Sequence, residues 1–598
     1  MSFNKDFGPQ GGKWLNVLNS MRGSITHRGK ADTQTVLNSK VCLSMNSKKD
    51  KGPIEFYIEG KHYYVMLDGY IFNINDLKPS LKHNKLKTGS PLELILFLFL
   101  EHGIEFIHKL NGIFSIALYD GNNFYLIRDR LGNKPIFYTV KGEILIFGSE
   151  IKSILKFPGV ECILDKSCLS EIFALGPAHI QGSGVFKDIK EVTPGSYLHF
   201  EENTFSLKQY WAIKPLPHTD SYEDTVAKTR KLILNSIESQ TEKNTASLLS
   251  GGVDSSIITA IANKTHKEKF GTAIQTFSFD FKGNSKYFTP SQFQPGQDRP
   301  WVEKLVAALK TDHTYLEADV NDLIDNLFKA VDARDCPGMA DVDSSLLYFC
   351  SKMANTNTAL SGECADEIFG GYPWFHKKEM FEAECFPWSS NMGLRKSILN
   401  ESLLSVLDIE GFADKTYKDA LKSTPVLESE NAVDKRRREL AYLNLKFFMM
   451  ALVDRMDRMG MYSGLELRAP YSDYRIAEYV FNIPWGIKFK DKTVKHLLRK
   501  SCEGVIPNEM LYRIKSPYPK TYNPAYDSLL KERLNDVIND NNQPLTPLIN
   551  KVEINKLINS PSDTGKPYYG QLMAKPQLLA YLLQVNYWLA NYKIIIKI

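Results

Sequence analysis

Two patterns of apolar and polar positions divide the chain near residue 211. Before it, short apolar runs alternate with polar and turn residues, as in "HYYVMLDGYIFN", "GIFSIALYDGNNFYLIRDRLG" and "EILIFGSE". This alternation, with its Asp-Gly and Gly-Asn turn pairs, predicts a β-rich region with two helices. After it, helical periodicity such as that of residues 226–237 alternates with short strands, "TFSFDF" and "TALSGE". That order predicts a parallel α/β sheet covered by helices.

The break between the two patterns is "WAIKPLPHTDSYED", a polar stretch with two prolines that we interpret as a linker. It predicts one domain over residues 1–211 and a second over 221–598. A long helical region is expected over 434–461, followed by a proline-interrupted helical tail. Its opening, "DKRRREL", has no interleaved aromatic residues. We therefore interpret it as the solvated face of an amphipathic helix rather than a nucleic-acid patch.

Composition is that of an ordinary globular protein and excludes several classes. The chain has 598 residues, 43% hydrophobic and 24% charged, and a formal charge of +5, which indicates neither a nucleic-acid nor a membrane partner. Its eight cysteines are scattered without a C-x-x-C pair, which predicts buried free thiols in a reduced compartment. The start resembles no signal peptide, and "LILFLFL" at 94–100 is too short to span a bilayer, so a cytoplasmic protein is expected.

A strand that stops on two glycines and resumes as a helix, "TASLLSGGVDSSIITAIA" at 245–262, predicts a ligand site. A glycine pair lets successive N–H groups converge, and the helix N-terminus adds partial positive charge. With the hydroxyls of Ser255 and Ser256, this is typical of a phosphate or pyrophosphate site, although a plain strand-to-helix turn is the alternative. There is no Gly-Lys-Ser/Thr ending, so it is not a Walker loop. Asp254 would repel the phosphates unless Mg²⁺ lies between them.

A second strand-to-helix segment, "TALSGECADEIFGGYPWF" at 358–375, carries three acidic residues. Glu363, Asp366 and Glu367 stand at i, i+3 and i+4, which predicts three carboxylates on one helix face. Favourable interaction with the helix dipole explains one of them comfortably but not all three. Asp366 is therefore a candidate second Mg²⁺ ligand, and Glu363 a candidate base or ammonium ligand.

Four motifs in order resemble the synthetase domain of glutamine-dependent asparagine synthetases: "SGGVDSS", "SGECADEIFGGY", "DRMGMYSGLELRAPYSD" and "LLRK…LYRIKSPYPKT". The resemblance runs from about residue 221 to the C-terminus. It implies an α/β ATP-pyrophosphatase (adenine nucleotide α-hydrolase-like) domain with a parallel sheet and a helical C-terminal part. It also implies that ATP converts a carboxylate to an acyl-adenylate, and that a nitrogen nucleophile then displaces AMP to form an amide.

Carried over residue by residue, the resemblance implies one site for ATP and Mg²⁺. Asp254 and Asp366 would bind Mg²⁺–pyrophosphate. Glu363 would receive a proton from the attacking amine, and Lys515 in "RIKSPYP" would stabilise negative charge at the adenylate and the leaving pyrophosphate. The implied phosphate- and nucleotide-binding residues are Leu249, Ser250, Gly252, Asp254, Ser255, Ser256, Phe277 or Ser278, and Gly362.

The front region resembles the family's glutaminase domain, an Ntn-type (N-terminal-nucleophile) α+β sandwich. "THRGKAD" at 26–32, "LNGIFSIALYDG" at 110–121, "RDRLGNKPIFY" at 128–138 and "FGSEIKSIL" at 147–155 carry this resemblance. In the family a cysteine follows the initiator methionine, and its α-amine acts as the base. Here Met1 precedes Ser2, and the first cysteine is Cys42. A serine serves other enzymes of this fold, so this change alone decides nothing.

Three further departures predict that the front domain does not hydrolyse glutamine. The family's oxyanion-hole Asn-Gly-Glu appears as Asp68-Gly69-Tyr70, and an ionised Asp68 would repel the developing oxyanion. The family's Ser-Asp-Thr-Glu, whose Asp holds the glutamine amine, appears as "SPLE" at 90–93. No arginine occurs between Arg28 and Arg128 to bind the glutamine carboxylate.

We therefore expect an ATP-dependent ligase that joins an aspartate-like acid to ammonia or an amine, with small-molecule partners and scope for a homodimer. One alternative is an intramolecular cyclase or amide synthetase of the β-lactam synthetase or lasso-peptide cyclase type, which shares the altered front domain. Another is a non-catalytic ATP-binding homologue. Two segments stay open: 285–305 as a lid or a surface loop, and the Asp-rich "DARDCPGMADVDSS" at 332–345 as an amine site or a set of helix caps.

Overall fold

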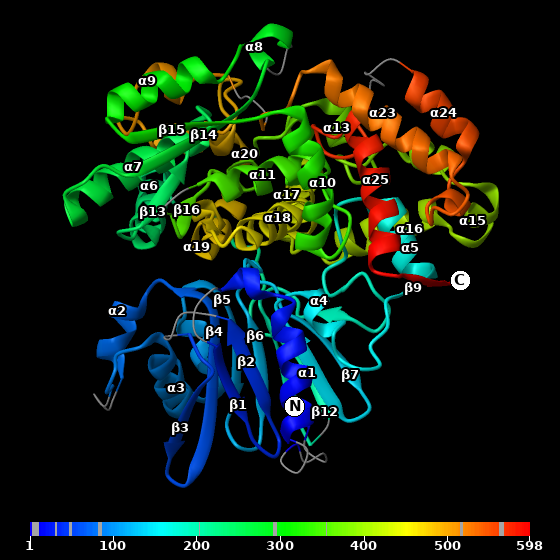
Figure 1. Ribbon diagram of the computed structural model, residues 1–598. Helices are drawn as coiled ribbons and strands as arrows, with labels where there is room; N and C mark the ends of the chain where they lie inside the picture. The colour runs from blue at the N-terminus through cyan, green and yellow to red at the C-terminus, as the bar shows by residue number, and fades with distance from the viewer. Residues whose placement is uncertain are drawn as a thin grey trace. The chain divides into compact units, whose positions relative to one another are not determined.

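The computed structural model in Figure 1 describes residues 1–2, 7, 11–29, 33–46, 51–81, 86–202, 204–290, 296–353, 356–514, 518–560 and 567–598. It divides into two units, Met1–Ile163 with Gln181–Ala212, and Leu164–Ile180 with Ile213–Ile598. The change of unit at Ala212 lies beside the expected linker. Residues 164–180, which the sequence pattern groups with the front region, belong to the second unit. Among the described residues, no helix combines the length and apolarity needed to cross a membrane.

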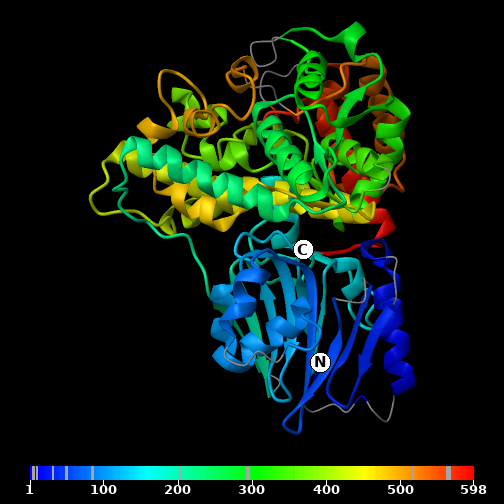
Figure 2. The same ribbon diagram turned by 90° about the vertical axis from the view of Figure 1, so that its left-hand side faces the viewer.

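The first unit is an α+β sandwich built on an antiparallel six-stranded sheet, seen in blue to cyan in Figure 2. The strand order is β12-β11-β6-β5-β4-β3, and two smaller sheets follow the orders β10-β7-β8 and β1-β2. The strands are β1 (Thr33–Leu37), β2 (Cys42–Asn46), β3 (Ile54–Ile58), β4 (Lys61–Ile71), β5 (Gly112–Tyr119), β6 (Phe124–Arg128), β7 (Phe137–Lys141), β8 (Ile144–Gly148), β10 (Lys190–Glu191), β11 (Ser196–Glu201) and β12 (Thr204–Gln209). The helices are α1 (Gly11–Gly23), α2 (Ile74–Leu77), α3 (Pro91–His102) and α4 (Ile151–Ile154).

Alternating side chains of the six-stranded sheet fill two cores. Val65 and Leu67 of β4 pack with the buried leucines of α3, whereas Tyr64 faces a second core with Leu145 of β8. Helix α3 begins where the Ser90 hydroxyl accepts a hydrogen bond from Glu93 N–H and ends at Gly103. This confirms that 94–100 is part of a buried helix. Asp120-Gly121 forms the turn between β5 and β6. The Asp68-Gly69 pair, by contrast, lies inside β4, opposite Ser115 and Phe114, so this part of the turn prediction is wrong.

The second unit is built on five parallel strands, which confirms the predicted sheet. Their order is β15-β14-β13-β16-β17, and every neighbouring pair is parallel. The strands are β13 (Thr245–Leu248), β14 (Gln275–Phe281), β15 (Asp312–Ala318), β16 (Thr358–Leu360) and β17 (Glu466–Arg468). The helices between them are α6 (Tyr222–Gln240), α7 (Val253–Phe270), α8 (Asn284–Tyr287), α9 (Arg299–Leu309), α10 (Val320–Arg334), α11 (Asp341–Lys352) and α12 (Ala365–Phe369).

Strand order reverses between β13 and β16. The chain passes from β13 through β14 to the edge at β15, then returns to β16 and β17 on the other side of β13. Because parallel crossovers are right-handed, α7 and α9 cover one face, and α10 and α11 cover the other. The loops at the carboxyl ends of β13 and β16 therefore open a crevice, which is where open α/β sheets bind ligands.

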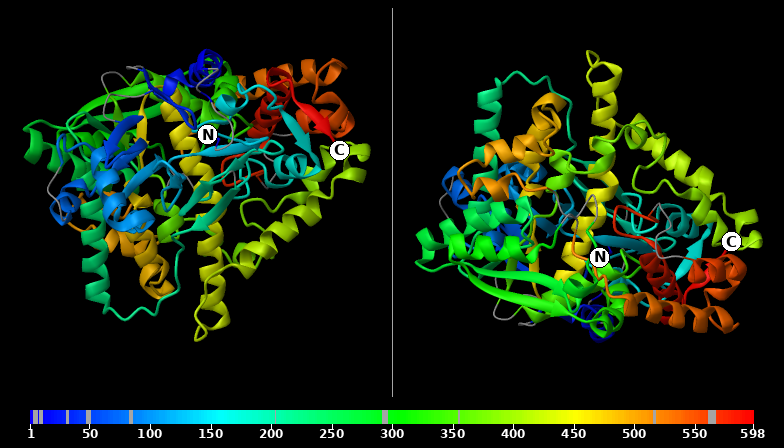
Figure 3. Two further views of the ribbon diagram at one scale, coloured as in Figure 1. Left: turned by 90° about the horizontal axis from the view of Figure 1, so that it is seen from below. Right: turned by 90° about the horizontal axis from the view of Figure 1, so that it is seen from above.

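The rest of the second unit is helical, as predicted. The rod over 432–462 comprises α17 (Ala432–Leu443), a π-helical turn (Asn444–Phe448) and α18 (Met449–Tyr462), and is yellow in Figure 3. The other helices are α5 (Lys166–Leu175), α13 (Lys378–Phe381), α14 (Met392–Ser397), α15 (Glu401–Val406), α16 (Ile409–Lys422), α19 (Tyr474–Phe481), α20 (Trp485–Lys488), α21 (His496–Ser501), α22 (Asn508–Leu511), α23 (Pro524–Asn539), α24 (Lys551–Asn559) and α25 (Lys575–Asn591). The short strands are β9 (Ile163–Asp165) and β18 (Ile595–Lys597).

The arginines of "DKRRREL" are not the solvated face that their charge pattern predicts. Arg436 donates to the carbonyls of Phe381 and Ala383, at 2.9 and 2.6 Å. Arg437 donates to the carbonyl of Phe375 at 3.0 Å. These guanidinium groups satisfy carbonyls of neighbouring loops, so their role is structural.

Candidate active site

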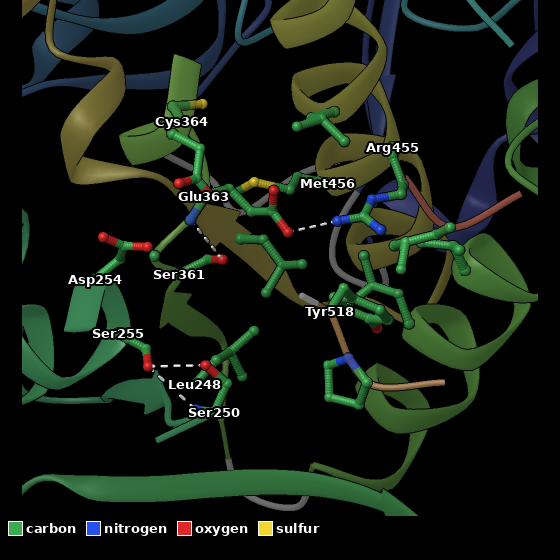
Figure 4. A pocket seen from close by; sticks show the side chains of 18 of the residues that line it. Leu248, Ser250, Asp254, Ser255, Ser361, Glu363, Cys364, Arg455, Met456 and Tyr518 are labelled. Atoms are coloured by element: carbon green, nitrogen blue, oxygen red, sulfur yellow. Dashed lines mark hydrogen bonds and ion pairs between the residues drawn. The ribbon is translucent and has the colours of Figure 1, made fainter. Parts of the chain in front are cut away.

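The turn after β13 is held open by hydroxyl groups and by one arginine. Ser250 Oγ and Ser255 Oγ lie 3.0 Å apart (Figure 4). Ser255 Oγ also donates to the Gly252 carbonyl at 3.2 Å. Gly251 has a φ of +73°, which favours glycine. The Arg513 guanidinium donates to the Gly251 carbonyl and lies 2.6 Å from Asp298. The backbone thus keeps the path that the sequence predicts for a phosphate-binding turn.

Gly362, at the end of β16, lies against the start of α7. A Cβ on Gly362 would lie 2.8 Å from the Ser255 backbone nitrogen, so only glycine fits. Ser256 is the next residue of α7, and its Oγ is buried with no hydrogen-bond partner among the residues that the structure describes. A cradle closed by glycine and a buried hydroxyl left without a partner fit a phosphate-bearing ligand.

Asp254 and Asp366 are brought together from β13 and β16, and Lys495 lies between them. Lys495 Nζ is 2.6 Å from Asp254 Oδ2 and 2.8 Å from Asp366 Oδ1. Burial would lower the pKa of Lys495, but the two aspartates outweigh it and raise the pKa above its ordinary value. The ammonium group therefore stays charged and holds two carboxylates close enough to share a Mg²⁺ ion.

The three acids of the second motif do not share one helix face, which corrects that prediction. Cys364 has a φ of +72°, so α12 begins only at Ala365 and Glu363 precedes it. Glu363 is paired with the buried guanidinium of Arg455 (Figure 4). Asp366 faces Lys495, whereas Glu367 accepts a hydrogen bond of 2.6 Å from the Tyr372 hydroxyl. Each carboxylate thus has its own partner.

Glu367 differs from the other two acids because it is only 2% exposed. Burial, followed by the neighbouring Asp366 carboxylate, raises the pKa of Glu367 to about 8. At neutral pH its protonated form therefore predominates. A neutral Glu367 lowers the charge repulsion among the neighbouring carboxyl groups.

A cavity of about 180 Å³ joins these groups. Ser250, Asp254, Gly362, Glu363 and Arg455 all line it. Its remaining walls come from several elements of the second unit: Leu249, Phe277, Phe279, Met339, Val342, Leu346, Phe448, Leu452, Met456, Tyr518 and Leu572. The cavity therefore places Glu363 and the aspartates around one volume, as one reaction would require.

Of the residues expected near adenosine, Leu249 and Phe277 line the cavity, and Leu249 N–H donates to the Phe277 carbonyl at 2.7 Å. Ser278 points elsewhere, because its hydroxyl lies 3.0 Å from His313 Nε2 on β15. Phe279, two residues beyond Phe277 on the same face, lines this cavity and the adjoining one. Its ring stacks on Phe349 at 4.3 Å. Phe279 thus offers an aromatic surface that sequence reasoning missed.

The π-helical turn before α18 sets which residues of that helix reach the cavity. Asn444 opens the turn, donating to the Leu440 carbonyl at 2.8 Å and accepting from the Trp374 indole at 3.3 Å. From this rod, Phe448, Leu452, Arg455 and Met456 line the cavity. Such turns are frequent at functional sites because they shift the register of a helix face.

Lys515, the second predicted catalytic residue, lies outside the described residues. The structure describes its neighbours Arg513, which holds the glycine turn, and Tyr518, which lines the cavity. Three further residues that contact the site were missed: Lys495, Arg455 and Arg513. Lys495 and Arg513 stand in the quoted "LLRK…LYRIK" region or next to it, but no local pattern distinguishes them from surface cations.

In the first unit, the position expected to form an oxyanion hole carries a buried ion cluster. Asp68 Oδ2 lies 3.0 Å from Arg28, and Ser149 donates to the same oxygen at 3.2 Å. Arg28 also lies 3.1 Å from the fully buried Glu150. His27 and Lys152 contact Glu150 as well, and Lys134 lies 3.8 Å from Asp68. The negative charges of Asp68 and Glu150 are thus balanced by cationic side chains of the same unit.

The segment expected to hold the glutamine amine has a structural role instead. Glu93 accepts hydrogen bonds from the backbone of Lys87, Thr88 and Gly89, at 2.6 to 2.9 Å. Burial would raise the pKa of Glu93, but these hydrogen bonds outweigh it and lower the pKa. Pro91, at the position of the family's Asp, has no carboxylate. All eight cysteines are free, and Cys336, Cys350, Cys364 and Cys502 are buried.

Comparison with known proteins accounts for both units. Residues 228–590 match the model of the asparagine synthase family, and residues 7–211 match that of the glutamine amidotransferase domain. "Asparagine synthetase [glutamine-hydrolyzing] 3" of Bacillus subtilis is 39% identical over 604 residues, 98% of each chain. "Asparagine synthetase [glutamine-hydrolyzing] 1" of the same organism is 27% identical over 86% of each chain. "Amidase chry2" of Gibberella zeae is 24% identical over 83% of each chain.

These matches define an ATP-dependent carbon–nitrogen ligase whose α/β ligase domain follows a domain of the glutamine amidotransferase type. The chain belongs to the asparagine synthase family.

Proposed function

We propose that this ligase adenylates aspartate, or a closely related acid, and transfers the acyl group to ammonia or an amine without hydrolysing glutamine. The products are then an amide, AMP and pyrophosphate. The observation that carries the first part is the Asp254–Lys495–Asp366 cluster at the strand-order reversal, beside the glycine cradle of Gly362. This charge pattern suits a Mg²⁺-bound pyrophosphate leaving group.

Each part of the proposed site has a defined task. ATP would lie with its phosphates over the turn of Ser250 and Ser255, and with its base toward Phe279. When bound, Mg²⁺ would neutralise phosphate charge from Asp254 and Asp366. Lys495 supplies a fixed positive charge beside the same phosphates. Lys515 would add a second one, as the family resemblance implies.

Glu363 is the proposed base for the attacking nitrogen. Its carboxylate lines the cavity, and Arg455 fixes its position by binding one of its oxygens. Arg455 is in turn held in a buried position beside the ring of Tyr518, 5.0 Å from the ring centroid. A base fixed in this way accepts a proton from ammonium or an amine without first reorganising.

The absence of glutamine hydrolysis is supported by Asp68. Arg28, Ser149 and Lys134 surround a carboxylate where a glutaminase of this family uses a neutral amide to stabilise an oxyanion. A second negative charge developing there would be repelled. Pro91 in place of the family's Asp, and the absence of arginine between Arg28 and Arg128, remove both anchors of glutamine.

The decisive experiment is to measure pyrophosphate release from ATP·Mg²⁺ with aspartate and with ammonium, glutamine or no nitrogen source. Mass spectrometry of the products identifies the amide. We expect asparagine with ammonium, and neither asparagine nor glutamate with glutamine. Glutamate release from glutamine would refute the inactive front domain. Pyrophosphate release only with amine-bearing acids, and not with aspartate, would instead favour an intramolecular cyclase.

A further inference from the structure

A cysteine, a histidine and a glutamate meet in the second unit, away from the residues that line the cavity. Cys336 Sγ lies 3.6 Å from His179 Nε2. The other ring nitrogen, His179 Nδ1, lies 3.2 Å from Glu171 Oε1. The thiol, imidazole and carboxylate thus lie in the order found at an activated cysteine, with the ring facing the sulfur and the Glu171 carboxylate placing negative charge beside the ring without hydrogen-bonding to it.

Helix α25 holds the two segments of this cluster together. Its Tyr581 hydroxyl donates to the Ile172 carbonyl of α5 at 2.9 Å. Its Trp588 indole donates to the Asp335 carbonyl, next to Cys336, at 2.7 Å. Glu171 is fixed by the backbone N–H of Ile180, which donates to it at 2.9 Å. The short distance between sulfur and imidazole is thus imposed by the fold.

Charge around the cluster favours a protonated imidazole. Burial would lower the pKa of His179, but the neighbouring Cys336 sulfur and Glu171 carboxylate outweigh it and raise the pKa to about 10. The buried guanidinium of Arg334 is near the sulfur and is balanced by Asp343 and Asp454, both at 3.0 Å. Tyr581 of α25 and Tyr592, the residue directly after this helix, face the same sulfur. Asp335 directly precedes Cys336 in the chain.

We propose that Cys336, His179 and Glu171 form a reactive thiolate–imidazolium site that small electrophiles and peroxide modify, and that its modification inhibits the ligase. Nothing in the ligase reaction requires this thiol, so the proposal goes beyond the proposed function. It rests on the geometry of three side chains from two distant segments of the chain.

The chemistry is that of a thiolate attacking a peroxide. The sulfur forms an S–O bond as the O–O bond of hydrogen peroxide breaks, and the leaving hydroxide takes the proton of the His179 imidazolium to become water. Sulfur is oxidised to a sulfenic acid and peroxide is reduced. With iodoacetamide the same sulfur forms a C–S bond and iodide leaves. Cys336 is 4% exposed, so reagents of this small size are the appropriate probes.

Modification at Cys336 would reach the cavity through the next three residues. Gly338 N–H donates to Gln584 at 3.2 Å, and Met339 N–H donates to Asp343 at 2.8 Å. A Cβ on Gly338 would lie 2.1 Å from Asp343 Oδ2, so the segment has no spare room. Met339 lines the cavity. An added oxygen at Cys336 is therefore expected to displace the cavity wall.

The test is the rate of iodoacetamide labelling of each cysteine in the native full-length protein, followed by peptide mass spectrometry. Cys350 and Cys502 are matched controls, because they are 2% and 1% exposed and burial raises the pKa of each to about 12. At about pH 6.5 an ordinary thiol is about 1% ionised. We expect Cys336 to react at least ~10-fold faster than both controls. Equal rates would overturn the proposal.

Two variants distinguish activation of the Cys336 thiol by its neighbours from mere accessibility of that thiol to the reagent. His179→Gln and Glu171→Gln should each slow labelling of Cys336 by ~10-fold or more, and leave Cys350 and Cys502 unchanged. Unaltered labelling of Cys336 in a folded Glu171→Gln protein would contradict the role of the triad even if His179→Gln failed to fold. In the coupled assay, peroxide should lower pyrophosphate release in the wild type but spare Cys336→Ser. Equal inhibition of both proteins would refute the link to the ligase.

Discussion

The two units each place a pair of carboxylates beside cationic side chains, but they balance them differently. In the first unit Asp68 and Glu150 face three cationic side chains, Arg28, Lys134 and Lys152. In the second, Asp254 and Asp366 both contact the ammonium group of Lys495. Next to that pair stand a glycine cradle and the buried hydroxyl of Ser256, which has no hydrogen-bond partner in the structure.

This difference separates a charge cluster that serves the fold from one that serves a ligand. A cluster whose charges are already matched gains little from an added ion. A cluster with excess negative charge gains from a divalent cation and its phosphates, because the cation offsets repulsion that the free protein bears. The same residue type, a partly exposed aspartate paired with a cation, therefore has opposite meanings in the two units. Three predictions test this contrast.

The largest expected effect is on activity, from the same substitution made in each unit. Asp366→Asn removes half of the proposed Mg²⁺ site and should reduce ATP-dependent pyrophosphate release by ~10³-fold. Asp68→Asn, its matched control in the first unit, should leave ammonia-dependent release within about twofold. A comparable loss in both variants would show that the first unit takes part in the ligase reaction.

Asp254 and Asp366 could be picked out from the sequence for a physical reason. The turn after β13 and the start of α12 each follow a strand directly, and glycines at such points are required by local backbone geometry. Adjacent parallel strands then bring their carboxyl ends together. Local sequence and fold therefore point to the same place, and the alternating pattern predicted the parallel sheet itself.

The cations that complete both clusters were not predictable in the same way. Lys495 reaches Asp254 from a distant segment in the left-handed conformation, with a φ of +55°. Its surroundings in the sequence are those of a surface lysine. The prediction that the three acids of the second motif share one helix face was wrong for a related reason. The helical spacing rule assumes a helix that begins at Glu363, whereas the helix begins only after Cys364. Charge patterns locate side chains only after the path of the backbone is known.

The next effect is on stability, and its size should differ between the units. Glu150 is fully buried and contacts His27, Arg28 and Lys152, so Glu150→Gln leaves cations unmatched. We expect it to lower the free energy of unfolding by about 3 kcal/mol. Asp254→Asn leaves Lys495 paired with Asp366 alone and should change stability by less than about 1 kcal/mol without Mg²⁺.

Denaturant unfolding of both variants, with and without Mg²⁺, measures this difference. Mg²⁺ should stabilise the wild type by linkage and should have a weaker effect on Asp254→Asn. Glu150→Gln should respond to Mg²⁺ as the wild type does. A stability loss in Asp254→Asn as large as that in Glu150→Gln would mean that the aspartates of the second unit also form a matched cluster.

The third prediction is a pH dependence of stability that has opposite directions for two buried glutamates. Burial and Asp366 raise the pKa of Glu367 to about 8, so the folded protein keeps a proton that the unfolded chain loses above about pH 4.5. Stability should fall as pH rises through this window, by up to about 1.4 kcal/mol per pH unit, and Glu367→Gln should remove that fall. The melting temperature of Glu367→Gln relative to wild type should therefore increase between about pH 5 and pH 8.

Glu93 provides the opposite case because backbone hydrogen bonds outweigh its burial and lower its pKa. Its contribution is present above the pKa of the unfolded chain and is lost as pH falls through the folded pKa. Glu93→Gln should therefore be destabilising at neutral pH, and the deficit should shrink below about pH 4.5. Melting temperatures of both variants across this range measure the two slopes. If both slopes had the same sign, the buried glutamates of the two units would respond to pH in the same way. The excess of negative charge in the second unit would then not be what distinguishes its carboxylates from those of the first.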